Sequence, residues 1–141
     1  MLDTLSNVKA RLGITTADQD TFLTQQITMI SDVIEAYCRR KFLSAQYLQT
    51  FYFDQNKPSR KFPLYHYPVT AVDHIALDGE NLDADEFRVH KPTGYILSTQ
   101  NGPTFFWAQE TEVQYTAGYA TCPTPILAVL DALVGERYAK K

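Results

Sequence analysis

Tyr115-Thr-Ala-Gly-Tyr-Ala-Thr-Cys-Pro123 is the stretch that decides the fold, because the pattern of the chain changes within it. Residues 112–116 are β-branched, aromatic and polar in the manner of a strand. Gly118 gives the backbone freedom to leave a sheet at this point. Pro125 suits the first turn of a helix, and apolar residues follow it at once. The stretch therefore predicts the end of a strand-rich region and the start of a closing helix.

Helical periodicity dominates the chain before the strand-rich region. A short helix is predicted from about Thr4 to Leu12, with Gly13 as its left-handed stop. Thr15 and Thr16 stand at capping-box spacing before a second, longer helix that runs to about Arg40. Its apolar residues recur at intervals of three and four and draw one stripe along the helix: Leu23, Ile27, Ile30, Ile34 and Tyr37. Met29 and Val33 widen this stripe beyond a simple coiled-coil seam.

Residues 44–119 follow a different pattern, with short β-prone runs separated by turns. The turn signals are Asp78-Gly79, Pro92-Thr93-Gly94 and Asn101-Gly102-Pro103. Strands this short and close together are expected to pair as antiparallel hairpins. We therefore predict an α+β fold, in which a small helical bundle carries an inserted antiparallel β-hairpin region. The bundle combines two N-terminal helices (1–43) with a C-terminal helix (123–141), and a length of 141 residues fits a single domain.

Composition narrows the classes of partner. The formal net charge is −3 and the pI is near 5.5, which argues against a dedicated nucleic-acid-binding protein. The start of the chain has no basic leader and no apolar run reaches the length of a membrane span, so we expect a cytoplasmic origin and no membrane partner. Nine Tyr and eight Phe indicate half-buried aromatic surfaces, either between subunits or in a core that satisfies the hydroxyl groups.

No motif in the sequence recommends a catalytic residue, a cofactor or a metal ion. His66, His74 and His90 lack the spacing of a metal site, and Cys38 and Cys122 are expected to be packing thiols. The acidic stretch 78–86 lacks the glycine and ligand positions of an EF-hand loop. The glycines between Gly94 and Gly102 do not form a phosphate-binding loop, and no nucleophile elbow is present.

Two blocks of opposite charge suggest an interface between subunits. The basic block comprises Lys57, Arg60 and Lys61, and the acidic block comprises Asp78, Glu80, Asp83, Asp85 and Glu86. Opposite charges on one chain can pair across a boundary between two copies of it. The alternative is that each block is an ordinary solvated loop.

The order of these motifs resembles the tailed-bacteriophage head–tail connector (adaptor) family. The resemblance covers most of the chain and rests on four segments: Leu5-Ser-Asn-Val-Lys-Ala-Arg-Leu-Gly-Ile14, Ile34-Glu-Ala-Tyr-Cys-Arg-Arg-Lys-Phe42, Tyr67-Pro-Val69, and Val113-Gln-Tyr-Thr-Ala-Gly-Tyr119 before Pro123. Each segment alone is weak evidence for the family, whereas the order and spacing of the four segments are more specific to it.

The resemblance implies a structural protein of the virion neck, without catalysis, that is assembled in the host cytoplasm. It implies a ring of about twelve subunits beneath the portal, around a channel through which DNA passes without sequence recognition. The implied partners are the portal protein on one side and the next neck or tail-completion protein on the other. The C-terminal segment of such proteins engages the portal, which would place Tyr138, Lys140 and Lys141 near that contact.

Two other functions remain open from the sequence. A small cytoplasmic α+β enzyme or ligand-binding domain would use the aromatic β layer to line a pocket. A nucleic-acid-binding module would use the bases at 39–41 and 57–61 together with the basic tail.

Overall fold

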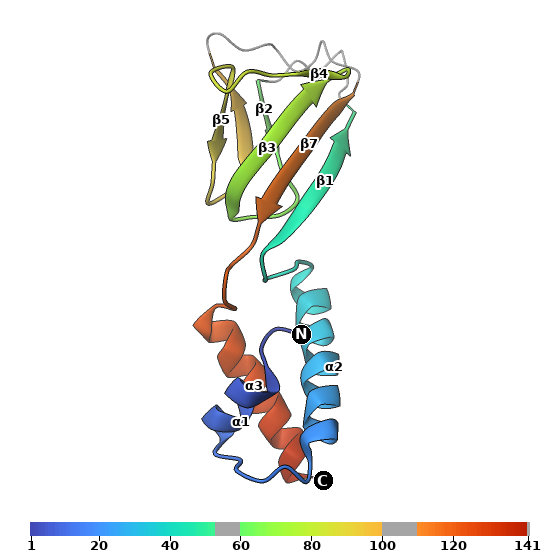
Figure 1. Ribbon diagram of the computed structural model, residues 1–141, viewed down its shortest axis with the longest axis vertical. Coiled ribbons are helices and arrows are strands. Elements are labelled where there is room, and N and C mark those ends of the chain that lie inside the picture. The colour runs from blue at the N-terminus through green and yellow to red at the C-terminus, as the bar shows by residue number, and fades with distance from the viewer. Residues whose placement is uncertain (53–59, 100–109, 141) are drawn as a thin grey trace. The chain divides into compact units, whose positions relative to one another are not determined.

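The computed structural model describes residues 1–52, 60–99 and 110–140 (Figure 1). The described ranges contain three α-helices: α1 Leu5–Leu12, α2 Asp20–Cys38 and α3 Thr124–Ala139. Between α2 and α3 the described residues form seven antiparallel strands, so the expected α+β class, with helices bracketing an antiparallel β region, is confirmed. Contacts divide the chain into two compact units, which we call the helical unit (Met1–Leu43 and Tyr119–Lys141) and the β unit (Ser44–Gly118).

The helical unit is held together by one apolar cluster to which all three helices contribute. The fully buried members include Val8 of α1, Leu23 and Ile27 of α2, and Leu130 and Val134 of α3. The two α2 positions lie on the predicted helical stripe, because residues three and four apart share one face of a helix. The periodicity therefore identified the α2 residues at the centre of this core.

Two details of α2 differ from the sequence prediction. The helix begins at Asp20, with Gln19 at the N-cap position and no side-chain capping hydrogen bond. Thr16 lies before the helix, and its carbonyl accepts a hydrogen bond from the Lys9 ammonium at 2.7 Å. Tyr37 was assigned to the buried stripe but is 89% exposed. The chain turns at Arg39, whose φ of 55° is left-handed, and Phe42 then fills the core at this end of the helix.

The β unit contains two sheets. The four-stranded sheet has the order β1-β7-β3-β4, and the three-stranded sheet has the order β2-β6-β5. The strands are β1 Ala45–Phe51, β2 Lys61–Pro63, β3 Val69–Leu77, β4 Glu80–Asn81, β5 Phe87–His90, β6 Tyr95–Ser98 and β7 Thr111–Ala117. The predicted turns at 78–79 and 92–94 join β3 to β4 and β5 to β6, whereas the predicted turn at 101–103 lies outside the described residues.

Strand β7 is the centre of the larger sheet, with β1 on one side and β3 on the other. Its side chains alternate between buried and half-buried, because successive residues of a strand point to opposite faces. Val113, Tyr115 and Ala117 lie in one apolar cluster with Phe62 of β2 and Ile96 of β6. Members of both sheets therefore share one core.

Candidate interaction surfaces

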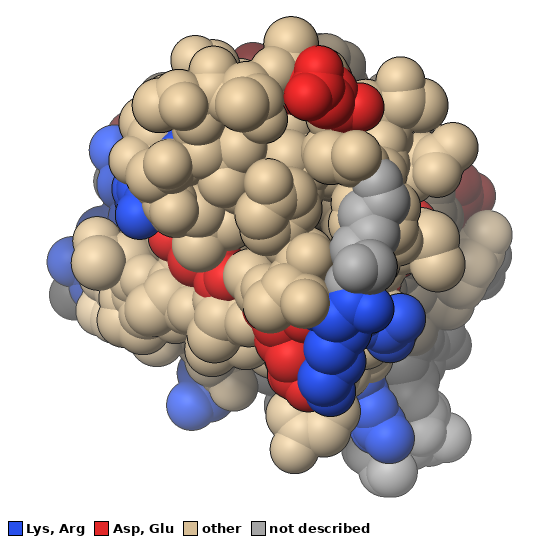
Figure 2. Space-filling view, turned by 90° about the horizontal axis from the view of Figure 1, so that it is seen from below, with Lys and Arg blue, Asp and Glu red and all other residues tan. Residues whose placement is uncertain are grey.

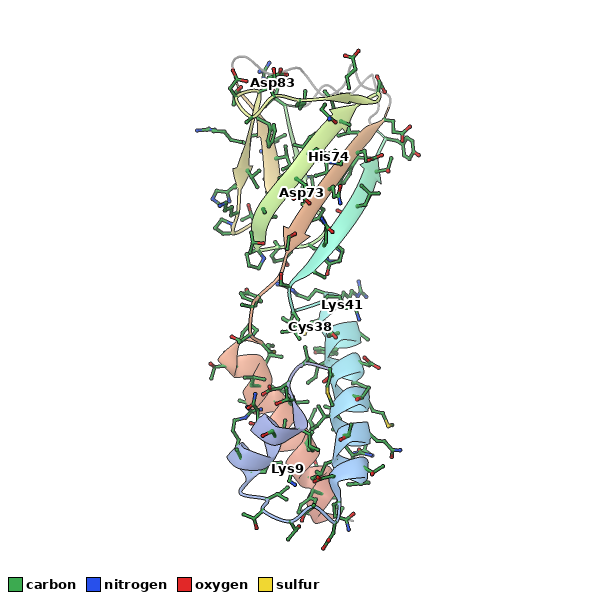
Figure 3. All side chains as sticks on the ribbon, viewed as in Figure 1. Lys9, Cys38, Lys41, Asp73, His74 and Asp83 are labelled. Carbon is green, nitrogen blue, oxygen red and sulfur yellow. The ribbon has the colours of Figure 1, made fainter. Side chains whose placement is uncertain are left out.

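Three salt bridges fasten the N-terminal segment and α1 to the other two helices. The guanidinium of Arg11 lies 2.6 Å from a carboxylate oxygen of Asp131 on α3 and 2.7 Å from one of Asp3. The ammonium of Lys9 lies 2.6 Å from a carboxylate oxygen of Asp20 at the start of α2. Figure 3 labels Lys9 in the helical unit. Hydrogen bonds to Asp131 hold the pKa of Arg11 above its ordinary value. Lys9 and Arg11 therefore form ion pairs that stabilise the helical unit.

The C-terminal end of α3 holds the residues that the resemblance assigned to the portal contact. Tyr138 is half-buried and packs against the core of the helical unit. Lys140 is exposed, and its ammonium lies 2.6 Å from Glu136, whose pKa this hydrogen bond lowers. Lys141 lies outside the described residues. Tyr138 thus has a packing role, and Lys140 remains at the surface.

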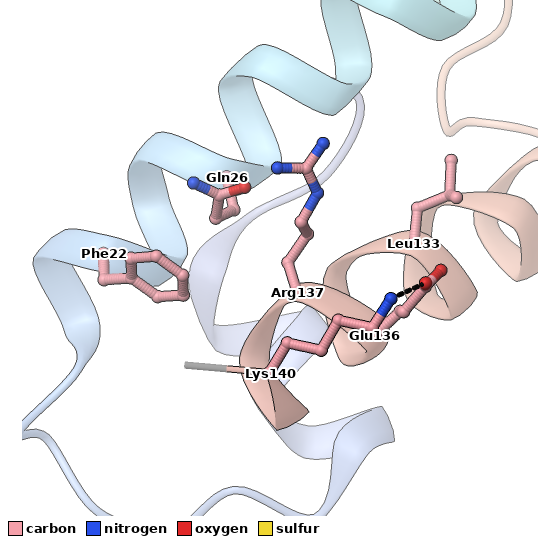
Figure 4. Close-up of a pocket in the computed structure, with 6 residues that line it drawn as sticks. All are labelled: Phe22, Gln26, Leu133, Glu136, Arg137 and Lys140. Carbon is pink, nitrogen blue, oxygen red and sulfur yellow. Dashed lines mark hydrogen bonds and ion pairs between the residues drawn. The ribbon is translucent and has the colours of Figure 1, made fainter.

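An open hollow of about 570 Å³ lies between α2 and α3 (Figure 4). Phe22 and Gln26 line it from α2, and α3 contributes Leu133, Arg137 and the ion pair between Glu136 and Lys140. From below, Figure 2 shows acidic and basic side chains lying next to one another amid surface that carries neither charge. The hollow has the mixed character of a protein-contact surface.

The basic block of the β unit makes contacts within its own chain. The guanidinium of Arg60 donates hydrogen bonds to the Thr99 carbonyl and, at 3.3 Å, to the Ser98 hydroxyl. The ammonium of Lys61 lies 5.9 Å from the centre of the Tyr95 ring, a cation–π distance. Lys57 lies outside the described residues.

The acidic block reaches the same part of the β unit. The carboxylates of Asp83, Asp85 and Glu86 lie within 4.8 Å of one another. Thr99, which accepts from Arg60, also donates through its hydroxyl to the Asp85 carbonyl at 2.6 Å and through its N–H to the Glu86 carbonyl at 3.0 Å. Arg60 of the basic block and Asp85 and Glu86 of the acidic block are therefore all hydrogen-bonded to Thr99 of the same chain.

The other two members of the acidic block lie around the turn between β3 and β4. Asp78 adopts a φ of 50° and accepts a hydrogen bond from the Glu110 N–H at 2.9 Å. Glu80 is exposed at the start of β4. Whether the two blocks also pair between copies stays a prediction.

The three histidines take part in separate contacts. His66 stacks on Tyr47 with ring centres 3.6 Å apart, and His74 lies 3.3 Å from Glu112. His90 shares a 2.6 Å hydrogen bond with Thr93. These positions do not bring the histidines together.

The overwide apolar stripe expected from the sequence leaves one exposed apolar surface on α2. Met29, Val33 and Tyr37 are 58%, 64% and 89% exposed, although the periodicity counted them with the core. They follow one another at intervals of four residues, which places them on one face of the helix. The width of the apolar stripe was the available signal, since one neighbouring helix cannot cover so wide an arc.

Comparison with known proteins identifies the family. A search of curated proteins finds no match to this chain. The model of one protein family, described as head completion protein, matches residues 1–134. The chain belongs to the head completion protein family.

Two solved structures share the fold of this head completion protein. One is the neck of an empty gene transfer agent particle computed with C6 symmetry: the similar chain has a TM-score of 0.69 and is 18% identical, with 98% of this chain and 78% of that chain covered. The other is the virion of the native gene transfer agent particle, with a TM-score of 0.68, 17% identity and the same coverage. At these identities the likeness shows a common fold.

Family membership confirms the relation to head–tail connector proteins and the structural, non-enzymatic role expected from the sequence. It also agrees with the expected place of a head completion protein at the head–tail junction of the virion. In the described ranges, no helix of this head completion protein has the length and apolar character needed to cross a membrane.

Proposed function

We propose that this chain forms a ring of about twelve copies beneath the portal protein and surrounds the channel through which DNA leaves the head. The observation that carries the proposal is the fold, which over 98% of the chain matches a chain from the neck of a particle. The structure of that neck was computed with C6 symmetry, which a ring of six or of twelve copies satisfies. The next neck or tail-completion protein would bind the opposite side of the ring.

The charge of the chain suits a channel through which DNA slides. Between Phe62 and Phe87 the sequence contains six acidic residues and no Lys or Arg: Asp73, Asp78, Glu80, Asp83, Asp85 and Glu86. Phosphate attraction supplies most non-specific affinity for DNA, so an acidic wall would hold the DNA weakly. We expect little retention of the assembled ring on duplex DNA at 0.1 M salt, and strong salt-sensitive retention would contradict this part of the proposal.

Ring formation is tested by native mass spectrometry of the purified chain, alone and with the portal protein. We expect a dominant species near twelve times 16.1 kDa. A pocket-bearing enzyme or ligand-binding domain would instead give one, two or four copies. A chain that stays monomeric in both samples would remove the ring proposal.

Reversal of the basic block tests whether the two charge blocks pair between copies. Arg60→Glu with Lys61→Glu is expected to reduce the ring fraction about tenfold, because like charges would then face each other across the boundary. The neutral pair Arg60→Gln with Lys61→Gln removes the same intrachain contacts and serves as the control. Equal assembly of the two double variants would show that the blocks act only within one subunit.

The portal contact is tested by Lys140→Glu. A truncation that removed Tyr138 would also remove packing of the helical core, so the single substitution is the cleaner change. We expect binding to purified portal to weaken roughly fivefold, about 1 kcal/mol for one exposed charge. Lys91→Glu, at an exposed position of the β unit, is the control. Unchanged binding of the Lys140 variant would place the portal contact elsewhere.

A further inference from the structure

Helix α3 is apolar around its whole circumference over most of its length. Residues 126–134 contain one polar side chain, Asp131, and that carboxylate is bound by Arg11 of α1. A helix that is apolar all round is typical of a helix buried on every side. In the isolated subunit, however, only one side of α3 is buried, by way of Leu130 and Val134.

The outer side of α3 is only partly covered in the described chain, where Leu133 also lines the hollow opposite Phe22 of α2. Ala128 and Ala132 are exposed, and Val129 and Leu133 are 47% and 37% exposed. We call these four residues the α3 patch. Because two of its members are alanines, a neighbouring helix can approach the α3 backbone closely. The sequence of α3 therefore indicates that something covers this side in the assembled state.

Helix α2 presents a patch of large side chains, in contrast to the two small alanine side chains of the α3 patch. Met29, Val33 and Tyr37, which we call the α2 patch, are long or branched side chains in a row along one face. They project from a helix whose other face supplies the core through Leu23, Ile27 and Ile34. Large side chains on one helix and small ones on another are the complementary surfaces that helix packing requires.

Charges beside the two patches are complementary as well. Most charges of the helices are paired within the unit, as in the ion pairs of Lys9, Arg11, Glu35 and Glu136. In the part of the chain that the structure describes, neither Asp32 on α2 nor Arg137 on α3 forms an ion pair. Asp32 adjoins Val33 in the sequence, and Arg137 follows Leu133 by one helical turn. The α2 patch thus has a negative charge beside it, Asp32, and the α3 patch has a positive charge beside it, Arg137.

We propose that the α2 patch of one copy packs against the α3 patch of the next copy. The inference rests on the proposed ring and names the surface that builds it. Unlike patches that meet head to tail make a heterologous contact, which closes into a ring when the rotation between copies permits. Every copy carries both halves of the contact, so a second copy of this chain supplies the cover that α3 lacks.

Single substitutions test each patch separately. Val33→Glu and Leu133→Glu place a charge in the α2 patch and the α3 patch, respectively. Each is expected to lower the ring fraction at least tenfold in native mass spectrometry, because the contact would bury an unpaired carboxylate. Ala10→Glu, at an exposed position of α1, is the matched control and should assemble like the wild type. Circular dichroism checks that all three variants fold.

Mixing the two defective variants gives the decisive result. In the mixture, the intact α3 patch of the Val33→Glu variant can pack against the intact α2 patch of the Leu133→Glu variant. The other two patches of this pair carry the introduced charges, so no third copy can be added. We expect a species of twice 16.1 kDa that contains one copy of each variant, and no ring. Rings from either variant alone, or no mixed dimer, would overturn the assigned contact while leaving the ring proposal intact. A wild-type chain that is monomeric both alone and with portal would overturn both proposals.

Discussion

Tyr115→Ala is expected to destabilise the β unit by about 3–5 kcal/mol, the usual cost of removing a buried aromatic ring. Tyr115 is fully buried at the centre of β7, and its ring lies 5.7 Å from that of Tyr47. Its hydroxyl donates to the Gln49 side chain at 2.5 Å and accepts from the His66 N–H at 3.3 Å. One side chain thus joins β1, β7 and the segment before β3.

Urea unfolding monitored by circular dichroism measures this effect. Tyr115→Phe keeps the ring and should cost about 1–2 kcal/mol, because the Gln49 and His66 groups lose a partner. Tyr95→Phe, at an exposed ring, should change the unfolding free energy by less than about 0.5 kcal/mol. If Tyr115→Ala were as mild as Tyr95→Phe, Tyr115 would not hold the sheets together.

The same tyrosine predicts a dependence of stability on alkaline pH. Burial raises the pKa of Tyr115 to about 12, above its ordinary value of 10.0. The folded state therefore keeps the proton more tightly, and this contribution is complete below pH 10 and lost as the pH rises through about 12. Tyr115→Phe should show a smaller loss of stability across that window than the wild type.

Arg11→Met is expected to destabilise the helical unit by about 2–3 kcal/mol, the scale of charge-assisted hydrogen bonds. The substitution keeps much of the aliphatic stem but leaves Asp3 and Asp131 without their shared cation. Their side chains are only 12% and 19% exposed, so water replaces the lost partner poorly. The N-terminal segment and α3 would lose their common link to α1.

Acid titration distinguishes this mechanism from lost packing. Burial alone would raise the pKa of Asp3, but hydrogen bonds from Asn7 and Thr4 and the contact with Arg11 outweigh it, and the pKa lies below its ordinary 3.8. The carboxylate therefore stabilises the fold above pH 3.8, and that stability is lost as the pH falls through the folded pKa. The unfolding free energies of wild type and Arg11→Met should converge below that pH. A constant difference down to pH 2 would indicate packing alone.

The helices were predictable from the sequence because their evidence is local. The spacing of Leu23, Ile27 and Ile34 fixed the buried face of α2, and Gly13 and Pro125 marked the end of α1 and the start of α3. The hairpin turns at 78–79 and 92–94 were likewise readable from their residues.

The remaining features depend on distant contacts. The sequence indicated a strand at 112–116, but not that β7 would pair with both β1 and β3, because strand pairing is decided by packing. The same limit applies to Tyr37, which lies on the helical stripe but is exposed, whereas Phe42 beyond the turn at Arg39 is buried in the core. Among the candidate site residues, the proximity of Arg60 to the acidic block could not be predicted from the sequence. It arises because Arg60 and Asp85, which are distant in the sequence, both form hydrogen bonds with Thr99.

The chain leaves and re-enters the helical unit at neighbouring points. Leu43 bridges to Tyr119, and the Tyr119 N–H donates to the Phe42 carbonyl at 2.8 Å. A short loop could span this gap, since closing a few residues costs little entropy. The gene could thus exchange the whole segment 44–118 for another module while keeping the helical scaffold, which would let one framework evolve to serve necks of different design.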